Sequence, residues 1–437
     1  MIILFDDLGY NDVGYKGSEI KTPNIDALAS QSLIFRQFYV FSWCSATRAA
    51  TETGVHPAML GMRSLEHNFS DGSALPATIP TIAEKLAAVG YSNIFLGKWH
   101  LSRNFSSGPL RRGYHRAFGF LSGQIDHFLH DDHHGRQVLF EGESFVDSEG
   151  HMTDLIYKKA EEKIFGTDRP FFMNISFSAP HYPIQNVDGF EEMNNHIDND
   201  DRRAYAGMVT HADYVIGKLI DLLDRTGDLE NTYIFLLSDN GAQKDWSNPK
   251  FYSGRFAGRE VLGSNQPLRS FKTSVYEGGI RVPFLLYAGT KKIAKEVDEF
   301  ATVLDLAPTI ANLTGAEKAE YIEGLDLFGV AAGSDEREIN FYWQTRSHSV
   351  PHGGGRQEAI RLGDFKLVRS QRRFAWLPYR VTWPWDNYEL FNIADDMAEE
   401  FDLSDERPDL VDALSRRMDE IRSRYQTRYM ELDAREK

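Results

Sequence analysis

A single cysteine, Cys44, occurs among the 437 residues of the sequence. One cysteine excludes a disulfide within the chain, so the redox compartment stays open. No apolar run is long enough to cross a bilayer, and there is no internal repeat or low-complexity tract. The formal charge of −16 disfavours nucleic acid and anionic membranes as general partners. We therefore expect no nucleic-acid partner and no membrane insertion, and an anionic substrate would need positive charge concentrated at its site.

No basic and apolar leader precedes the first apolar run, "IILF", which begins at residue 2. On this ground alone, the protein either stays inside the cell or has a secretion signal that this chain does not include. With 42% hydrophobic and 26% charged residues, the composition is that of an ordinary soluble globular protein. The length suits one large domain with a smaller one, or two or three domains.

Short apolar runs alternate with helical patterns through the first three quarters of the chain. The runs are "IILF" (2–5), "NIFL" (93–96), "FFMNISF" (171–177), "YIFLL" (233–237) and "VPFLLYA" (282–288). They are continuous rather than alternating, which is typical of buried parallel strands. Helical patterns cover residues 22–35, 79–90, 153–166, 204–223 and 304–315, the last interrupted by Pro308. This alternation predicts a doubly wound α/β domain with a mostly parallel sheet over residues 1–330.

The pattern changes after about residue 330. "EINFYW", "EAIRLG" and "FKLVRS" are short and half-alternating, which is typical of a small antiparallel sheet, and residues 408–432 form a closing helical pattern. We therefore predict a smaller α+β subdomain over residues 331–437.

Functional side chains follow four of the apolar runs. Ligands of open α/β sheets bind beyond the carboxyl ends of the strands, so these side chains would meet if the strands are parallel neighbours. The side chains are Asp6 and Asp7, then Lys98 and His100, then His181, and finally Asp239 and Asn240. One such junction means little, because Asp and Asn are common in turns and a lone His is more often structural. Four junctions in one chain favour a shared pocket.

The residue types suggest a division of labour within such a pocket. Carboxylate and amide oxygens suit Ca²⁺ or Mg²⁺ better than Zn²⁺, while lysine and histidine supply cations and proton donors. A tetrahedral oxyanion ester fits this combination. Lys272 and "EGGIRVP" precede the last apolar run, although that segment alone would be interpreted as structural.

Cys44 opens a short helical segment, "SATRAATETG", and Arg48 lies one turn further on. A helix N-terminus is a favourable place for an anion. Cys44 is either a small buried hydrophobe, as free cysteines usually are, or a reactive or modified side chain.

The motifs together resemble the type I, formylglycine-dependent sulfatases. The likeness runs from residue 2 to about residue 405 and includes "ILFDDLGYNDVGYKG", "CSATR", "GYSNIFLGKWHL", "APH", "YIFLLSDNGA" and "LRSFKTSVYEGGIRVPF" in order. Within that family the sequence most resembles the N-acetylgalactosamine-4-sulfatase (arylsulfatase B) branch and related bacterial polysaccharide sulfatases. The resemblance implies an alkaline-phosphatase-like α/β fold and a sulfuric ester hydrolase.

The resemblance also implies a role for each site residue. Cys44 would be oxidised to Cα-formylglycine, and its hydrate would attack sulfur to form a Ca-assisted sulfo-enzyme intermediate. One Ca²⁺ would be bound by Asp6, Asp7, Asp239, Asn240 and residue 44. The catalytic set would be Cys44, Arg48, Lys98, His100, His181 and Lys272. In that set His181, with Lys272, assists departure of the alcohol, and His100 takes a proton from the second hydroxyl.

The sequence departs from the family in one place, where Ala46 replaces the proline of the usual Cys-x-Pro-x-Arg modification signal. Alanine here is similar to the signals accepted by radical-based maturases of anaerobic bacteria. The implied partner is therefore a formylglycine-forming maturase of that type, and the implied source is bacterial. Family members are mostly periplasmic, secreted or lysosomal, and the resemblance implies a periplasmic or secreted location here.

Two segments are candidates for selecting the alcohol. Residues 123–136 ("GQIDHFLHDDHHGR") include His127 and could be a solvated loop, which we favour, a second metal site or a substrate loop. Residues 369–388 mix arginines with aromatic rings, with Arg372, Arg373 and Trp376 as candidate sugar contacts. The alternative for the second segment is a surface loop that packs its aromatic side chains on the main domain.

Three classes of function remain at this point. The first is a sulfatase acting on a sulfated carbohydrate, in particular a galactose-type 4-sulfate in an oligosaccharide or polysaccharide. The second is a phosphomonoester, phosphodiester or phosphonate hydrolase of the same superfamily, and the third is a non-catalytic glycan-binding relative.

Overall fold

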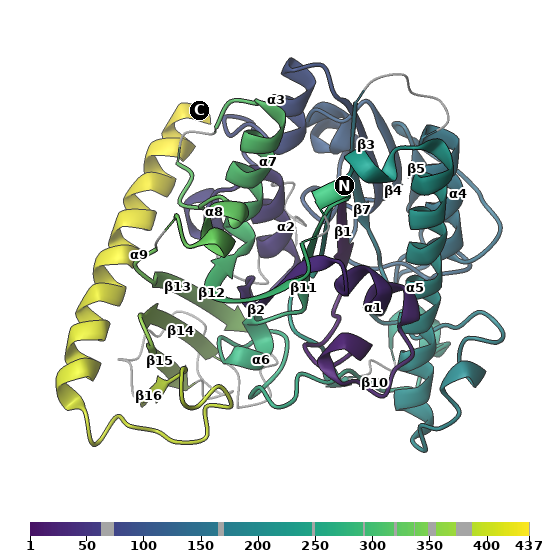
Figure 1. The fold of residues 1–437 in the computed structure, drawn as a ribbon. Helices are drawn as coiled ribbons and strands as arrows, with labels where there is room; N and C mark the ends of the chain where they lie inside the picture. The colour runs from purple at the N-terminus through teal and green to yellow at the C-terminus, as the bar shows by residue number, and fades with distance from the viewer. Residues whose placement is uncertain are drawn as a thin grey trace.

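A ten-stranded mixed sheet forms the centre of the molecule (Figure 1). The computed structural model describes residues 1–62, 74–164, 170–246, 250–291, 293–318, 321–335, 337–347, 355–372 and 387–436. In spatial order the strands are β12 (Lys295–Thr302), β2 (Ser32–Tyr39), β11 (Phe284–Ala288), β8 (Tyr233–Ser238), β1 (Ile2–Phe5), β7 (Phe171–Ser176), β3 (Ser92–Lys98), β4 (Arg116–Phe120), β5 (Leu139–Glu141) and β6 (Ser144–Phe145).

The middle of this sheet is parallel. β1 pairs in parallel with β7 and β8, and β3 pairs in parallel with β7 and β4. Alternate residues of β1 enter two separate cores: Ile2 and Leu4 lie in one, and Ile3 and Phe5 lie in the other. A strand buried on both faces has no polar face, which is why "IILF" is continuously apolar.

Helices cover both faces of the sheet. One face carries α1 (Pro23–Ala29), α4 (Met152–Ile164) and α5 (Asp200–Thr226), and the other carries α2 (Cys44–Thr53), α3 (Ile82–Ala88), α6 (Glu277–Ile280), α7 (Leu306–Thr314) and α8 (Leu327–Ala332). The predicted doubly wound α/β architecture is confirmed.

A second, antiparallel sheet follows in the chain, with the order β13 (Asn340–Ser347), β14 (Gly355–Leu362), β15 (Phe365–Arg372) and β16 (Asn387–Asn392). The long helix α9 (Pro408–Glu436), yellow in Figure 1, lies along it at the outer side of the molecule. The predicted small antiparallel sheet and closing helix are thus confirmed. A short two-stranded sheet pairs β9 (Lys244–Trp246) with β10 (Val261–Leu262).

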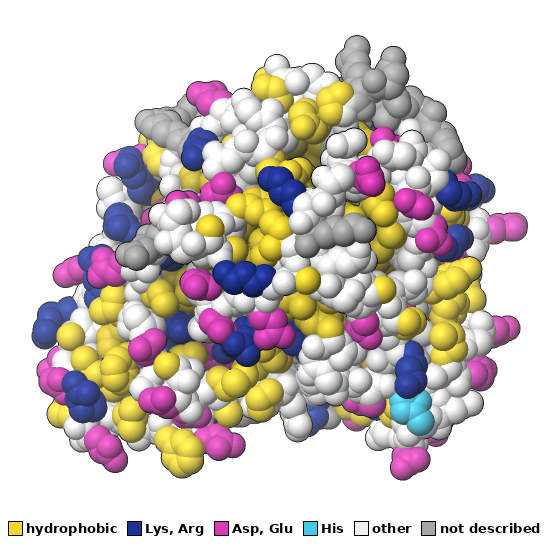
Figure 2. Space-filling view, in the orientation of Figure 1, with side chains coloured by type: hydrophobic (Ala, Val, Ile, Leu, Met, Phe, Trp, Pro, Cys, Tyr) yellow, Lys and Arg dark blue, Asp and Glu magenta, His cyan; other side chains and the backbone are white. Residues whose placement is uncertain are grey.

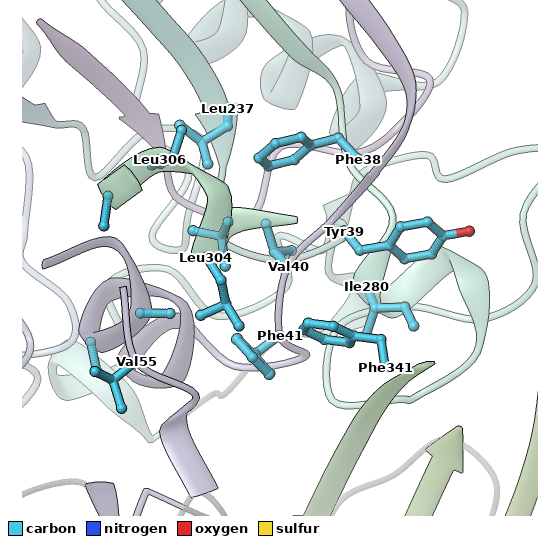
Figure 3. Packing of buried hydrophobic residues seen from close by; sticks show 14 of the residues in the cluster. Phe38, Tyr39, Val40, Phe41, Val55, Leu237, Ile280, Leu304, Leu306 and Phe341 are labelled. Atoms are coloured by element: carbon cyan, nitrogen blue, oxygen red, sulfur yellow. The ribbon is translucent and has the colours of Figure 1, made fainter. Parts of the chain in front are cut away.

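The two main sheets share a hydrophobic core. Phe341 of β13 lies beside Phe41 and Ile280 in Figure 3, and the Phe41 and Phe341 ring centroids are 5.9 Å apart. The division at residue 330 remains a prediction, and it falls inside α8.

Three details of the sequence interpretation are wrong. The helix expected over residues 22–35 ends at Ala29, and the following residues form strand β2, because no glycine or proline separates the two apolar patterns. The run at 282–288 forms β11, which is antiparallel to both of its neighbours. Pro308 does not interrupt its helix, because it lies in the first turn of α7, where a missing N–H costs no hydrogen bond.

Candidate active site

The carboxyl ends of four adjacent strands, β8, β1, β7 and β3, meet at one edge of the sheet. Asp6 and Asp7 follow β1, and Asp239 follows β8. Ligand atoms of these three carboxylates and of Cys44 all lie within 4.8 Å of one another. The parallel pairing of these strands therefore brings the carboxylates together at one edge of the sheet, as the strand junctions in the sequence predicted.

Each carboxylate of this cluster has a basic partner in the buried interior. The nitrogen–oxygen distances are 2.6 Å for Lys98 Nζ to Asp6 Oδ2, 2.6 Å for Lys272 Nζ to Asp7 Oδ1, and 2.8 Å for Arg48 Nη2 to Asp239 Oδ2. Three negative and three positive side chains thus balance. A divalent cation added to this set would leave a net positive site suited to an anion.

Two buried oxygens at this edge accept no hydrogen bond within the described part of the chain. They are Oδ1 of Asp6 and Oδ1 of Asn240. Asn240 Nδ2 donates to Asp7 Oδ1 at 2.7 Å, which fixes the orientation of its amide. Buried polar atoms usually have partners, so two unpaired hard oxygens beside three carboxylates fit a cation such as Ca²⁺.

Cys44 is the first residue of α2 and is 4% exposed. Burial, followed by the charge of Asp239, raises the pKa of its thiol to about 12. An unmodified Cys44 would therefore remain a protonated thiol at neutral pH, which is a poor nucleophile. Arg48, one turn along α2, donates to the Lys98 carbonyl at 2.8 Å and to Ser176 Oγ at 2.7 Å, which anchors the first turn of the helix over the strand ends.

Lys272 reaches the site from a segment that the sequence alone suggests is structural. Its backbone N–H donates to the Ala242 carbonyl at 3.0 Å, and the next N–H, of Thr273, donates to the Ser42 carbonyl at 2.9 Å. The segment is therefore pinned between the residues after β8 and the residues before α2, which directs the Lys272 side chain at Asp7.

The two histidines lie at the open side of the carboxylate cluster. His181 Nδ1 donates to the Tyr182 carbonyl at 2.7 Å, which leaves Nε2 facing Asp7 Oδ2 at 3.7 Å. Burial, followed by Lys272, lowers the pKa of His181 to about 3, and burial with Lys98 also lowers the pKa of His100. An anion bound beside Lys272 would oppose the effect of the lysine charge and so raise the pKa of His181.

Asp7 and His100 both have left-handed backbones, with φ of 68° and 53°. Such a conformation is uncommon outside glycine and costs about 1–3 kcal/mol, and it concentrates at functional sites. For Asp7, burial favours the neutral acid, but Lys272, His181 and Lys98 outweigh it and lower the pKa of the carboxyl to about 2. Asp239 shows the opposite balance, because burial and Asp6 raise its pKa to about 6.

A cavity of about 650 Å³ opens over these groups. Its walls include Asp7, Cys44, His100, His181 and Lys272. The rest of the cavity wall includes Arg103, Gly123, Asp132, His133, Arg136, Phe145 and Phe251. This volume lies in the usual range for organic ligands, about 300–1,000 Å³, and far exceeds what a sulfate group alone would fill.

The histidine- and aspartate-rich segment 123–136 is only partly the solvated loop that we favoured from sequence: residues 128, 129 and 134–136 are exposed, while Asp132, His133 and Arg136 line the cavity, as the substrate-loop alternative requires. Asp126, His127, His130 and Asp132 are each at most 3% exposed. Oδ1 of Asp126 accepts the backbone N–H groups of Phe128 and Leu129, so the acidic side chains here build turns. His127 stacks on His151 at 4.9 Å and does not line the cavity, so its predicted direct contact with a sugar has no support.

A second group of possible metal ligands, His151, Asp154 and His211, lies where α4 packs on α5. His151 Nδ1 accepts the Thr153 N–H at 3.2 Å, and its Nε2 lies 3.1 Å from the Gln185 carbonyl. Both ring nitrogens of His151 are therefore engaged in capping and bridging, which is a structural role.

The second candidate segment contributes little to the described site. Arg373 and Trp376 lie outside the described residues, as does the side chain of Arg372. Arg369, in β15, is 1% exposed and pairs with Glu358 and Asp419, so it holds the small sheet to α9.

Several site residues were missed from sequence. A Cβ at Gly123 would lie 2.7 Å from His100 Nε2, so glycine is required beneath that ring. Ser176 supports Arg48, and Arg103 and Arg136 line the cavity. Gly123 and Arg136 lie in segment 123–136, for which a substrate loop was one of the three alternatives, whereas nothing in the local sequence distinguishes Arg103 or Ser176 from ordinary turn and surface residues.

The parallel strand ends, the hard-oxygen cluster and the surrounding cations define a hydrolase of oxyanion esters. The chain belongs to the sulfatase family, since the Sulfatase family model matches residues 1–316. It is thus a sulfuric ester hydrolase, and this family generally uses Ca²⁺ and formylglycine.

Relatives and solved structures agree with this assignment. Arylsulfatase J of Mus musculus is 30% identical over 96% of this chain and 75% of its own length. The N-acetylgalactosamine-6-sulfatase of Canis lupus familiaris is 26% identical over 87% of this chain and 73% of its own. The crystal structure of Ps i-CgsB in complex with k-i-k-neocarrahexaose has a TM-score of 0.81 and 28% identity, and covers 96% of this chain and 92% of that one.

No helix in the described part of the chain combines the length and apolar character needed to span a membrane.

Proposed function

We propose that this chain removes a sulfate ester from a sulfated carbohydrate, with Cys44 oxidised to formylglycine as the nucleophile precursor. The observation that carries the proposal is the position of Cys44: a buried, protonated thiol whose sulfur adjoins three carboxylates at a helix N-terminus. A thiol gains nothing from that setting, whereas a hydrated aldehyde presents two hydroxyls to it. The maturase that makes the aldehyde is a partner we propose on the same ground.

One Ca²⁺ would be held by Asp6, Asp7, Asp239, Asn240 and residue 44. It would supply positive charge that polarises the sulfate group and offsets carboxylate repulsion.

The cations of the chain bind the rest of the sulfate in this proposal. Lys98 and Lys272 are positioned to hold sulfate oxygens once a metal shares Asp6 and Asp7 with them. Arg48 fixes the first turn of α2. The charge of the bound sulfate opposes that of Lys272 and favours a protonated His181 ring, whose Nε2 then donates a proton to the departing sugar oxygen. His100 accepts a proton from the second hydroxyl of residue 44 when sulfate leaves.

The alcohol we propose is a galactose-type sugar sulfated at position 4, within an oligosaccharide. The likeness of the sequence to the 4-sulfatase branch supports this position, and the similarity to Ps i-CgsB, solved with k-i-k-neocarrahexaose, supports an oligosaccharide. N-acetylgalactosamine-6-sulfatases are also similar to this chain, so the position of the sulfate must be measured.

The test compares a chain produced with a maturase, in which peptide mass spectrometry finds the aldehyde at residue 44, with the Cys44→Ala variant. We expect the converted chain to release sulfate from a 4-sulfated galactose-type oligosaccharide faster than from its 6-sulfated isomer, and Cys44→Ala to release none. Full turnover by a chain whose Cys44 is still a thiol would contradict the proposal that formylglycine is the nucleophile precursor. Faster cleavage of phosphodiesters than of every sulfated sugar would overturn the substrate class.

Removal of the metal is a separate test. We expect exhaustive chelation to abolish turnover and Ca²⁺ to restore it, with one Ca²⁺ per chain in metal analysis. Stoichiometric zinc at this site, or full activity after chelation, would contradict the metal proposal. Ser45→Ala, next to Cys44 but outside the carboxylate cluster, is the matched control for the Cys44→Ala variant.

A further inference from the structure

A group of basic and aromatic side chains lines the same cavity and has no role in the sulfate chemistry above. We call Arg103, His133, Arg136 and Phe251 the rim cluster. They come from three separate segments, yet they line the same cavity of about 650 Å³ as Cys44 and Lys272. A ligand whose sulfate lies at Cys44 therefore extends towards them.

Arg136 is held in a defined orientation by a buried carboxylate. Its Nε and Nη2 donate to Asp132 Oδ2 at 2.8 and 2.6 Å. The Asp132 side chain is 4% exposed, whereas that of Arg136 is 63% exposed. Within the described part of the chain, Arg136 Nη1 makes no hydrogen bond, so the outer edge of the guanidinium faces solvent, preorganised for a second anion.

The loop that carries Arg136 and His133 is itself braced. Arg255 Nη1 lies 3.1 Å from Asp126 Oδ2, and its Nη2 lies 3.0 Å from Asp131 Oδ2. The His133 ring stacks on Phe251, with centroids 4.5 Å apart and an angle of 29° between the planes. Binding would therefore cost little ordering of the loop.

Two arginines, Arg103 and Arg136, face one carboxylate, Asp132, on the described cavity wall outside the metal cluster, although the whole chain is acidic. Burial, followed by the charge of His134, lowers the pKa of His133; Asp132 opposes this shift, and Arg103 and Arg136 add to it. Asp132 is the one carboxylate on the described cavity wall outside the metal cluster, and Arg136 neutralises it. On the face drawn in Figure 2, by contrast, acidic and basic side chains are interspersed.

We propose that the rim cluster binds a second anionic group, carried by the sugar next to the one that is desulfated. Arg136 and Arg103 bind this sulfate or carboxylate, and the Phe251–His133 stack offers an apolar ring face to the sugar. This inference rests on the proposed carbohydrate sulfatase function and narrows its substrate to chains with anionic groups on adjacent residues.

The test measures binding on the full-length Cys44→Ala chain, so that no turnover occurs. Three oligosaccharides of equal length are titrated: one with a single sulfate, one with a second sulfate on the adjacent sugar, and one with a carboxylate there. We expect Arg136→Ala and Arg103→Ala each to weaken binding of a doubly anionic ligand about tenfold or more beyond any effect on the singly sulfated one. The ligand with the larger loss identifies the anion.

Arg111→Ala is the matched control. Arg111 makes the same forked pair, with Glu143 at 2.7 and 2.9 Å, and its side chain is 60% exposed, but it does not line the cavity. We expect it to change none of the three affinities. Arg136→Lys keeps the positive charge but loses the two parallel N–H donors, so it should retain only part of the preference for doubly anionic ligands. This variant tests the proposal even if Arg136→Ala folds poorly.

Equal losses on all three ligands, or none on the doubly anionic ones, would overturn the rim proposal. A converted wild-type chain that releases sulfate from no sulfated sugar would instead overturn the proposed function. The two failures are distinguishable, because the binding comparison requires no catalysis.

Discussion

At the scale of single residues, Ala46 is the position where the chain departs from the usual modification signal. It is the third residue of α2, and the N–H of a residue in the first helical turn has no acceptor within the helix. Proline is tolerated there.

We expect Ala46→Pro to leave the thermal unfolding midpoint nearly unchanged. By restoring Cys-x-Pro-x-Arg, it should increase the fraction of Cys44 converted by an oxygen-dependent generating enzyme, as measured by peptide mass spectrometry. Ala49→Pro, in the interior of the same helix, is the control and should destabilise the protein by about 3 kcal/mol or more. Equal conversion of wild type and Ala46→Pro would show that residue 46 does not select the enzyme.

His181 supports a second prediction at this scale. A sugar alkoxide must be protonated as it leaves, whereas a nitrophenolate scarcely needs a proton. We expect His181→Ala to lower kcat on a sulfated sugar about 100-fold or more, and to lower kcat on 4-nitrophenyl sulfate much less. The exposed His196 provides the control substitution. Equal losses on both substrates would remove His181 from the acid role.

At the scale of elements, His56 ties three parts of the structure together. Its Nδ1 accepts the Ala58 N–H at 3.2 Å at the start of the short 3₁₀ helix Pro57–Leu60. Its Nε2 donates to the Tyr342 carbonyl of β13 at 2.9 Å, and its ring stacks on Tyr425 of α9 with centroids 4.3 Å apart. The segment after α2 is thereby joined to the small sheet and to the closing helix.

Acid should weaken this junction. Burial lowers the pKa of His56 to about 3 in the folded protein, while the unfolded chain keeps about 6.5. Below pH 6.5 the unfolded state binds a proton that the folded state excludes, so stability falls as pH falls, by about 1.4 kcal/mol per pH unit. We expect His56→Gln to be less stable at pH 8 but to lose about 2 kcal/mol less than wild type between pH 6.5 and 5.

Chemical denaturation at several pH values measures this difference. His196→Gln, at an exposed histidine, is the control and should leave the pH dependence unchanged. Parallel stability curves for wild type and His56→Gln would show that His56 is not the titrating group.

Elements that are buried on both faces could be predicted from the sequence, and partly exposed ones could not. Strands buried on both faces, such as β1 and β8, could be read from continuous apolar runs, and with them the positions of Asp6 and Asp239. The edge strand β12 could not, because half of its residues are exposed and polar. The direction of β11 could not be predicted either, since an apolar run has no preferred orientation in a sheet.

The same limit applies to the site. Side chains placed by strand ends were foreseeable, whereas those placed by long loops were not. Lys272 depends on backbone contacts between segments far apart in the chain, which no local pattern encodes. Arg136 is held locally by Asp132, but it reaches the cavity only because the loop folds beside segments distant in sequence. Family resemblance supplied Lys272 but not the rim cluster.

At the scale of the whole molecule, a buried ion network joins the small sheet to the segment after Lys272. Lys366 Nζ lies 2.8 Å from Glu277 Oε1 and 2.9 Å from Glu399 Oε1, and each of the three side chains is at most 1% exposed. Glu399 also accepts the backbone N–H of Glu277 at 2.7 Å. The C-terminal part therefore fixes the start of α6, five residues after Lys272.

We expect Lys366→Met to destabilise the whole chain by about 3–5 kcal/mol, because it removes the cation paired with buried Glu399 and leaves buried Glu277 with Arg281 as its remaining ion-pair partner among the described residues. The thermal unfolding midpoint measures the effect, and Glu399→Gln in the same chain should recover part of it. Arg407→Ala, which breaks an exposed pair with Asp409, is the control and should have no measurable effect. An unchanged midpoint for Lys366→Met would contradict a stabilising role for the network.

The burial of Cys44 fixes an order of events in biosynthesis. The site over α2 closes only when β1, from the first residues, lies between β7 and β8, which are synthesised much later. If Cys44 is converted to formylglycine as we propose, the converting enzyme must therefore reach it while the chain is still open, before the last central strands enter the sheet. Protein that folds first keeps its thiol, and supplying the enzyme afterwards cannot correct it without unfolding. Under the proposed function, the relative rates of modification and folding would then set the fraction of active molecules.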